Sequence, residues 1–286
     1  MPLAPVNGID LYYEQHGSGF PLVWSHEFAG DYRSWKPQVQ FFSRRYRVIT
    51  YNARGYPPSA VPESIDDYTQ EGSVDDLKGL LDHLGIEVAH IGGLSMGGNV
   101  ALNFGLTYPE MARSLVVAGT GSGSTDPEAF RANVNQRAEE MRAGGMESMG
   151  DYSNSPTRVQ LLRKDPLGYE EFRQGLMEHS ALGSALTFAG VQGRRPTIFA
   201  LEEQMKALDV PTLIMTGDED DPCIETSVFM KRCIPKSGLA VIPQSGHAIN
   251  LEEPDLFNRL VLDFLTSVEQ DAWAEQGAGD QSGSLL

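Results

Sequence analysis

The sequence has little cysteine, no long apolar run and no recognisable leader, and each shortage excludes a class of protein. Only Cys223 and Cys233 are present among 286 residues, which argues against a disulfide framework and fits two free thiols in a reducing compartment. No apolar run approaches the roughly 20 residues that a membrane-spanning helix needs. The first eight residues have neither the basic nor the apolar region of a secretory signal. We therefore expect a cytoplasmic protein without a membrane span.

Positive charge is also scarce. The chain carries 22 Lys and Arg against 39 Asp and Glu, a formal net charge of −17. Nucleic acid and anionic lipid both require a positive surface, so neither is an expected partner. A His-Glu-x-x-His metal motif and a Gly-x-Gly-x-x-Gly dinucleotide fingerprint are both missing. We therefore predict no metal site and no cofactor. The oligomeric state has no sequence signal.

Strand-like and helix-like segments alternate in the first and last parts of the chain. The predicted strands span residues 9–14, 21–25, 47–51, 88–91, 114–118, 211–215 and 239–242. The predicted helices span residues 35–42, 73–84, 95–108, 224–233 and 254–268. Apolar strands alternating with helices predict a mostly parallel sheet covered on both faces, hence the α/β class.

Residues 121–209 interrupt this alternation. Helix-forming stretches at 129–141, 169–182 and 198–208 occur there without a convincing strand. We predict a core formed by residues 1–120 and 210–270, with residues 121–209 inserted as a helical cap. Residues 271–286, which are rich in Gly and Ser from position 277, are predicted to be a disordered tail.

The sharpest motif surrounds Ser95 and reads Gly92-Gly93-Leu94-Ser95-Met96-Gly97-Gly98. It follows a predicted strand and opens a predicted helix. A serine on such a tight turn has a strained backbone and needs small neighbours two positions away, which Gly93 and Gly97 supply. The turn exposes the hydroxyl, and the helix amino end favours developing negative charge. A Gly-rich turn of a doubly wound sheet would explain the glycines but not the serine.

A nucleophilic serine requires a base, and His247 is the best placed histidine. It lies in a loop directly after the last predicted strand, where open α/β sheets place functional groups. His83 and His179 fall in helical patterns and His90 in a strand, so we interpret these three as structural.

The orienting acid should lie on another such loop. The segment 216–222 follows the strand 211–215 and contains four carboxylates, Asp218, Glu219, Asp220 and Asp221. The residues alone do not choose among them. The chain order Ser, Asp, His is that of α/β-hydrolases.

With these segments in place, the chain resembles the α/β-hydrolase superfamily, in the branch of capped esterases, lactonases, haloperoxidase-like enzymes and carbon–carbon bond hydrolases. The resemblance runs from about Gly8 to Val268 and is interrupted by the insertion, which corresponds to the family's cap. It rests on the turn around Ser95 and on the segments 52–59, 217–220 and 245–247. It implies Asp220, three residues after Gly217, as the acid, with Asp218 and Asp221 as alternatives if the alignment slips.

An acyl-transfer site needs two backbone N–H groups aimed at one oxygen. The Met96 amide, next after the nucleophile, is the first candidate. The resemblance implies the Phe28 amide as the second and makes His26 a structural residue of that loop. Glu27 departs from the family, in which glycine is usual at this position. Either the loop has an ordinary backbone conformation there, or the carboxylate lies close to the site.

These residues together predict a serine hydrolase that cleaves a small-to-medium apolar carboxylic ester, or a lactone. Alternatives with the same machinery are hydrolysis of a carbon–carbon bond or of an amide. A third alternative, which Glu27 favours, is a ligand-binding receptor with vestigial activity. The residues expected to line the substrate pocket are Phe28, Met96 and Met149, together with Glu27, Trp35, Met141, Met146 and Phe188.

Overall fold

One eight-stranded sheet forms the centre of the molecule, with strands in the order β1-β2-β4-β3-β5-β6-β7-β8. The computed structural model describes residues 2–274. The strands are β1 (Leu3–Val6), β2 (Ile9–His16), β3 (Phe20–Ser25), β4 (Tyr46–Tyr51), β5 (Ala89–Leu94), β6 (Ala112–Ala118), β7 (Thr212–Gly217) and β8 (Ser237–Ile242). Strand β2 is antiparallel to β1 and β4, and the other pairs are parallel. The predicted α/β class with a mostly parallel sheet is confirmed.

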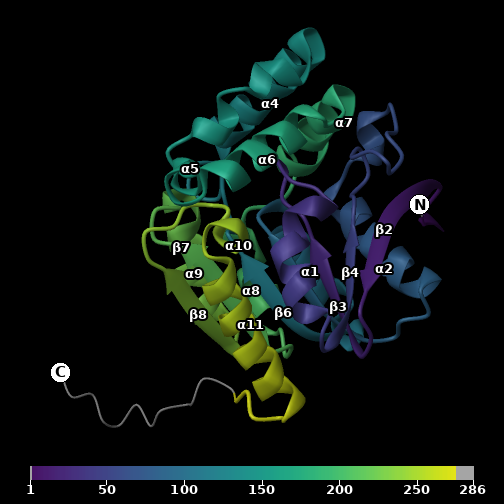
Figure 1. Cartoon of the computed structure of the whole chain (residues 1–286), viewed down its shortest axis with the longest axis vertical. Helices are drawn as coiled ribbons and strands as arrows, with labels where there is room; N and C mark the ends of the chain where they lie inside the picture. Colours follow the sequence, from purple (N-terminus) through teal and green to yellow (C-terminus); the bar gives the residue numbers. More distant parts are fainter. Residues whose placement is uncertain (1, 275–286) are drawn as a thin grey trace.

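Helices cover both faces of this sheet, as Figure 1 shows. They are α1 (Lys36–Phe42), α2 (Gln70–His83), α3 (Met96–Thr107), α4 (Pro127–Gly144), α5 (Val159–Lys164), α6 (Pro166–Met177), α7 (Ala181–Leu186), α8 (Glu202–Lys206), α9 (Asp221–Cys233), α10 (Ile249–Glu252) and α11 (Pro254–Glu269). Helices α1 and α11 pack on one face, whereas α2, α3 and α9 pack on the other.

The alternation of side chains along each strand explains the two apolar layers. In β3, Leu22 and Trp24 point into the layer under α1 and α11, while Val23 points into the opposite layer. Successive residues of a strand face opposite sides of the sheet, so a strand buried on both sides must be apolar throughout. This requirement produces the continuous hydrophobic runs of the sequence.

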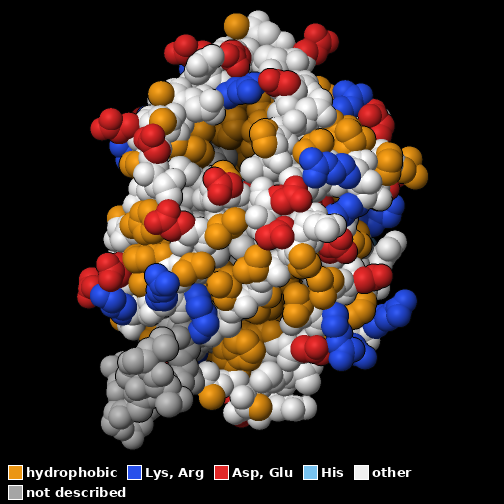
Figure 2. Space-filling view, turned by 90° about the vertical axis from the view of Figure 1, so that its left-hand side faces the viewer, with side chains coloured by type: hydrophobic (Ala, Val, Ile, Leu, Met, Phe, Trp, Pro, Cys, Tyr) orange, Lys and Arg blue, Asp and Glu red, His pale blue; other side chains and the backbone are white. Residues whose placement is uncertain are grey.

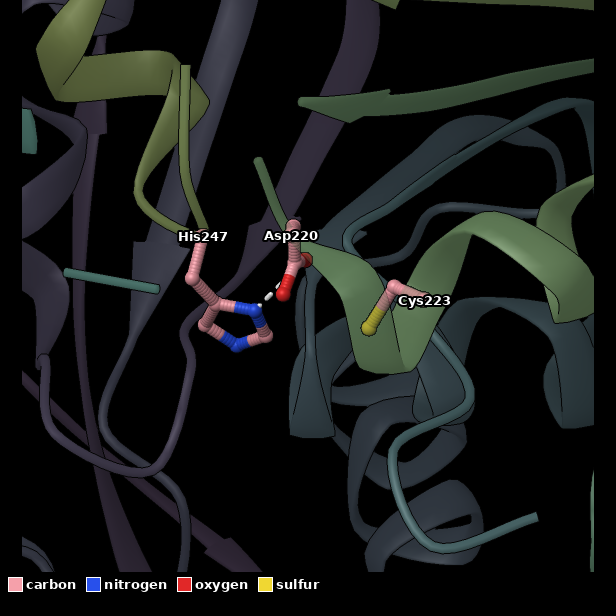
Figure 3. A group of neighbouring side chains, drawn as sticks. All are labelled: Asp220, Cys223 and His247. Carbon is pink, nitrogen blue, oxygen red and sulfur yellow. Dashed lines mark hydrogen bonds and ion pairs between the residues drawn. The ribbon is translucent and has the colours of Figure 1, made fainter. Parts of the chain in front are cut away.

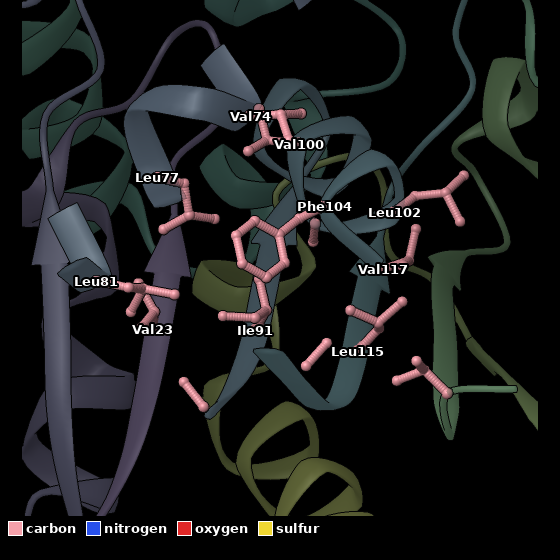
Figure 4. Packing of buried hydrophobic residues seen from close by; sticks show 14 of the residues in the cluster. Val23, Val74, Leu77, Leu81, Ile91, Val100, Leu102, Phe104, Leu115 and Val117 are labelled. Carbon is pink, nitrogen blue, oxygen red and sulfur yellow. The ribbon is translucent and has the colours of Figure 1, made fainter. Parts of the chain in front are cut away.

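The layer beneath α2 and α3 holds the strand that carries Ser95. Figure 4 shows Leu77 and Leu81 of α2 and Phe104 of α3 packed over strand residues that include Ile91 and Leu115. Leu77, Phe104 and Leu115 are fully buried. Helix α3 also approaches β6 closely, since a side chain at Gly105 would collide with Leu115. This packing sets where α3 begins and so positions the turn before it.

Residues 121–209, which we call the cap segment, contain helices and turns but no strand among the described residues between β6 and β7. Helices α4 to α7 gather at one end of the molecule, to which the sheet presents the carboxyl ends of its parallel strands (Figure 1). The end of the cap segment behaves differently. Ile198, Leu201 and Met205 pack into the layer of α2 and α3, so this last predicted helical stretch belongs to the packing of the core.

Some local features differ from the sequence prediction. Strand β1 was not predicted, because four residues that include Pro5 give too short a pattern. Helix α5 was also not predicted. Trp273, assigned to the tail, instead packs edge-on against Phe264 at 4.7 Å, and its Nε1 donates to the Lys236 carbonyl oxygen at 2.9 Å. The predicted disorder from residue 277 onward lies outside the described residues.

Among residues 2–274, no helix has the length and apolar character needed to cross a bilayer. Figure 2 shows acidic and basic side chains interspersed over one face of the molecule, with hydrophobic side chains between them. Charge on this face is therefore dispersed rather than gathered into a patch of one sign.

Replacing Leu115 by alanine should lower the free energy of unfolding by about 2–5 kcal/mol, because the change opens a cavity in a fully buried layer. The matched control is Leu167→Ala, at a position with 73% exposure, where we expect a change within about 0.5 kcal/mol. Urea unfolding followed by circular dichroism measures both. Equal effects of the two variants would contradict the described core.

Candidate active site

Ser95 lies at the junction of β5 and α3, with φ 57° and ψ −109°. Positive φ is rare for a residue with a side chain and costs on the order of 1–3 kcal/mol, which the surroundings must offset. A side chain at Gly93 would collide with the Gly97 carbonyl group, and one at Gly97 would collide with the Ser25 carbonyl group. The Ser95 N–H donates to the Ala118 carbonyl oxygen at 2.8 Å. Glycines thus permit the strained turn, and β6 holds it in place.

His247 and Asp220 form a buried pair on the two loops that follow β8 and β7. His247 Nδ1 lies 2.8 Å from Asp220 Oδ2, and Figure 3 shows the other ring nitrogen pointing away from the carboxylate. Burial raises the pKa of the Asp220 carboxyl. The charge of His247 and its hydrogen bond together lower this pKa by more, so the net pKa lies below the ordinary value. An ionised carboxylate accepts a hydrogen bond from the Nδ1–H group, and this tautomer leaves a basic lone pair on Nε2.

Gly119, directly after β6, marks the point at which the three functional loops meet. A side-chain carbon at Gly119 would lie 3.1 Å from the Leu94 side chain, 3.4 Å from the His247 carbonyl oxygen and 3.5 Å from Asp220 Oδ2. Leu94 immediately precedes Ser95. The parallel sheet therefore brings the serine, histidine and aspartate loops together at the carboxyl ends of neighbouring strands.

The other carboxylates of the 216–222 loop have different partners. Asp218 Oδ1 accepts from the Ser245 N–H at 3.2 Å, and Glu219 Oε2 accepts from Gln160 Nε2 at 2.7 Å. Asp221 is the first residue of α9. Among the four candidates, the geometry places Asp220 on the imidazole of His247.

Cys223 adds a thiol to this pair, and the ligand atoms of Asp220, Cys223 and His247 lie within 4.8 Å of one another (Figure 3). Metal ions bind cysteine as the thiolate. Burial, together with the Asp220 charge, raises the pKa of the Cys223 thiol well above its ordinary value. The thiol is therefore neutral, and His247 Nδ1 and Asp220 Oδ2 are already bonded to each other, so these side chains do not fit a metal site.

The loop after β3 is held in place by its own histidine and by Tyr56. His26 Nε2 accepts from the Ala53 N–H at 3.0 Å, so Nδ1 carries the proton and donates to the Glu27 carbonyl oxygen at 2.7 Å. Burial lowers the pKa of His26, which keeps the ring neutral. Tyr56 donates its hydroxyl to the Phe28 carbonyl oxygen at 2.9 Å. Both ring nitrogens of His26 are therefore engaged by the backbone.

Glu27 is buried in this loop and forms an ion pair with Arg158 of the cap segment. Glu27 is not among the described residues that have a positive φ. Its backbone conformation is therefore one that a residue with a side chain adopts readily, and glycine is not required at this position. Arg158 Nη1 donates to Glu27 Oε1 at 3.1 Å, and Nη2 bonds to Oε2. Burial raises the pKa of Glu27, but the Arg158 charge outweighs this effect and holds the pKa below its ordinary value. The two alternatives considered for Glu27 therefore both hold: its backbone has an ordinary conformation, and its carboxylate is buried in the loop that also carries the Phe28 amide.

Apolar side chains from the core and the cap segment form a cluster that includes Met96, the residue directly after Ser95. This cluster combines Phe28 and Met96 with residues of the cap segment, namely Met141, Met146, Met149, Phe172 and Phe188. The rings of Phe28 and Phe188 stack with centroids 3.6 Å apart. Trp35 is not brought to this cluster. It stacks on Trp24 at 4.5 Å in the layer under α11, because its turn leads into α1 on the face of the sheet.

His179 is a feature of the site that sequence patterns missed. It lies between α6 and α7 rather than within a helix, and its ring packs edge-on against Tyr56 at 5.1 Å. Neither ring nitrogen has a hydrogen-bond partner among the described residues. It lines a pocket of about 530 Å³ between α6 and the segment from Ala29 to Gln40. The sequence shows only a lone histidine within a helix-forming stretch at this position. That pattern does not predict a side chain that lines a pocket.

Burial lowers the pKa of His179 to about 4, which predicts a stability that depends on pH. The unfolded chain takes up this proton near pH 6.5, whereas the folded chain does so only near pH 4. Stability therefore falls as the pH drops from about 6.5 to 4, by roughly 1–3 kcal/mol from this residue. His179→Gln should make that decline shallower in urea unfolding, whereas His16→Gln, at an exposed position, should not. A decline as steep as that of the wild type would contradict the assignment.

Comparison with known proteins identifies the family to which this fold belongs. The family described as the alpha/beta hydrolase fold matches residues 21–254. The 3-oxoadipate enol-lactonase 1 of Acinetobacter baylyi is 30% identical over 87% of this chain and 89% of its own. A thermophilic esterase from Thermogutta terrifontis is 29% identical with a TM-score of 0.84, covering 93% of this chain and 98% of its own. The enol-lactonase of Burkholderia xenovorans LB400 is 26% identical with a TM-score of 0.81, and the match covers 93% of this chain and 100% of the enol-lactonase chain. The chain therefore belongs to the α/β hydrolase fold family and is a hydrolase.

Proposed function

We propose that this protein is a serine hydrolase that cleaves a small-to-medium, largely apolar carboxylic ester or lactone. The observation that carries the proposal is the strained turn at Ser95, whose loop meets those of the hydrogen-bonded pair His247 and Asp220 around Gly119. Ser95 is the nucleophile, His247 its general base, and Asp220 the carboxylate that orients the imidazole.

The reaction follows from these roles. His247 Nε2 takes the Ser95 hydroxyl proton as Oγ attacks the substrate carbonyl carbon. The tetrahedral intermediate collapses when the imidazolium returns the proton to the leaving alkoxide, which produces an acyl-enzyme. Water then attacks the acyl group by the same route and regenerates Ser95. Asp220 remains ionised throughout and stabilises the imidazolium.

Two backbone amides are the proposed oxyanion donors. Met96 is the first residue of α3, and the first amides of a helix have no acceptor within that helix. The Phe28 amide belongs to the loop that His26, Tyr56 and Arg158 hold in place. Rigid donors stabilise the oxyanion without the reorganisation that water would need.

The apolar cluster and the comparisons support the substrate class. Phe28 and the cap methionines form an apolar cluster with Met96, the residue after the proposed nucleophile, and such surroundings suit an uncharged acyl chain. Similar proteins include an enol-lactonase and an esterase. The receptor alternative depended on the negative charge of Glu27 near the oxyanion, and Arg158 neutralises that charge.

Ser95→Ala should abolish both labelling by a fluorophosphonate and hydrolysis of p-nitrophenyl esters, because each requires the serine oxygen. We expect kcat to fall by about 10³-fold or more. The matched control is Ser122→Ala, a serine of the loop after β6 with no proposed role in the chemistry. A wild type that does not label would contradict the mechanism. Faster turnover of an anilide or a diketone than of an ester or lactone would contradict the substrate class.

Tyr56→Phe removes the hydroxyl that anchors the Phe28 carbonyl group. We expect kcat for a p-nitrophenyl ester to fall by about 10-fold, with a smaller change in KM, because the displaced loop aims the Phe28 amide less well. Tyr68→Phe is the control, since that hydroxyl donates to the Pro62 carbonyl oxygen instead. Equal kcat values in the two variants would count against Phe28 as a donor.

A further inference from the structure

The buried ion pair of Glu27 and Arg158 joins the loop after β3 to the cap segment. The side chains are 1% and 5% exposed, so solvent screens their charges little. The Arg158 guanidinium also stacks over Tyr152 at 4.7 Å and lies 5.7 Å from the Phe172 ring centroid. Arg158 is thus fixed by a bidentate carboxylate and by two aromatic rings.

This pair lies beside the catalytic residues. The residue before Arg158, Thr157, accepts a hydrogen bond from the His247 N–H at 2.6 Å through its carbonyl oxygen. The Glu27 carboxylate interacts with the charge of His247, and Arg158 interacts with the charge of Asp220. The pair also borders the pocket near α6, because Glu27 packs against Gly30 and Phe172 lines the same space.

The two charges of the pair cancel, so the pair presents no net charge to a substrate. An unpaired arginine at this depth would attract a substrate carboxylate, since charge interactions strengthen away from water. With Glu27 present, Nη1 and Nη2 of the guanidinium each bond to a carboxylate oxygen, so the charge of Arg158 is already paired. The pocket wall adds no compensating positive charge, because its acidic residues, Asp31, Asp165, Glu171 and Glu178, outnumber Arg33 and Lys36.

We propose that Glu27 is a specificity-determining residue, a built-in counter-ion that occupies Arg158 and makes the site select uncharged over anionic esters. The inference rests on the proposed ester or lactone hydrolysis and names its substrate class. It also gives the departure from glycine at position 27 a function, because the carboxylate neutralises a cation that the cap segment brings to the site.

The test compares two substrates of similar length, p-nitrophenyl pentanoate and p-nitrophenyl hemisuccinate, at pH 7.5 and constant ionic strength. The readout is the ratio of kcat/KM for the anionic ester to that for the neutral ester, in which a general loss of activity cancels. Glu27→Gln frees Arg158 and should raise this ratio by about tenfold or more. Arg158→Met leaves the carboxylate unpaired and should lower the ratio.

The double variant Glu27→Gln with Arg158→Met distinguishes an effect of charge on selectivity from a general loosening of the site. It should return the ratio to within about threefold of wild type, and neutral replacement of a buried ion pair is often well tolerated. If Glu27→Gln does not fold, the comparison of Arg158→Met with the double variant gives the same test. Fluorophosphonate labelling accompanies each assay. Labelled enzymes with unchanged ratios would overturn this inference alone, whereas a wild type that does not label would overturn the proposed function and this inference with it.

Discussion

The turn between β5 and α3 constrains more of this protein than any other feature. Ser95 is held at a positive φ, and such strain persists only where the surroundings leave no alternative. The Ser25 and Gly97 carbonyl groups exclude side chains at positions 97 and 93. The packing of Phe104 and Leu115 fixes the axis of α3 behind the turn. The strand order then brings the loops of Asp220 and His247 to the same edge of the sheet.

The cap segment is more than a cover, because it contacts two of the loops on which the proposed chemistry depends. Thr157 bonds to the backbone of His247, and Arg158 pairs with Glu27. A displacement of this part of the cap would therefore move the proposed base and the loop of Phe28 together. Two adjacent residues of the cap segment therefore link the proposed selection of substrates to the geometry of the proposed reaction.

Much of this arrangement could be predicted because its residues carry local signals. The glycines around Ser95 report a tight turn, and the positions of His247 and Asp220 after apolar strands report a functional edge of the sheet. Trp35 was expected in the pocket but packs on Trp24. Helical spacing indicates that a residue is buried, but it does not indicate whether the residue faces the substrate pocket or a layer of the core. His179 lacked any local signal, since its neighbours Tyr56 and Asp31 are far away in the sequence.

The sequence by itself determined the α/β class, the order of the core elements and the strained turn, because periodicity and glycine requirements act between residues close in the chain. The residues alone left four carboxylates as partners of His247; the resemblance implied Asp220, and the tertiary structure places it there. Only the tertiary structure decided that Glu27 pairs with Arg158, 131 residues away. It also decided that the end of the cap segment, at Ile198 and Met205, packs with the core. Such pairings depend on how distant segments are oriented in space. The partner of a buried charge is therefore set by the tertiary fold, and the residues next to it in the sequence do not indicate it.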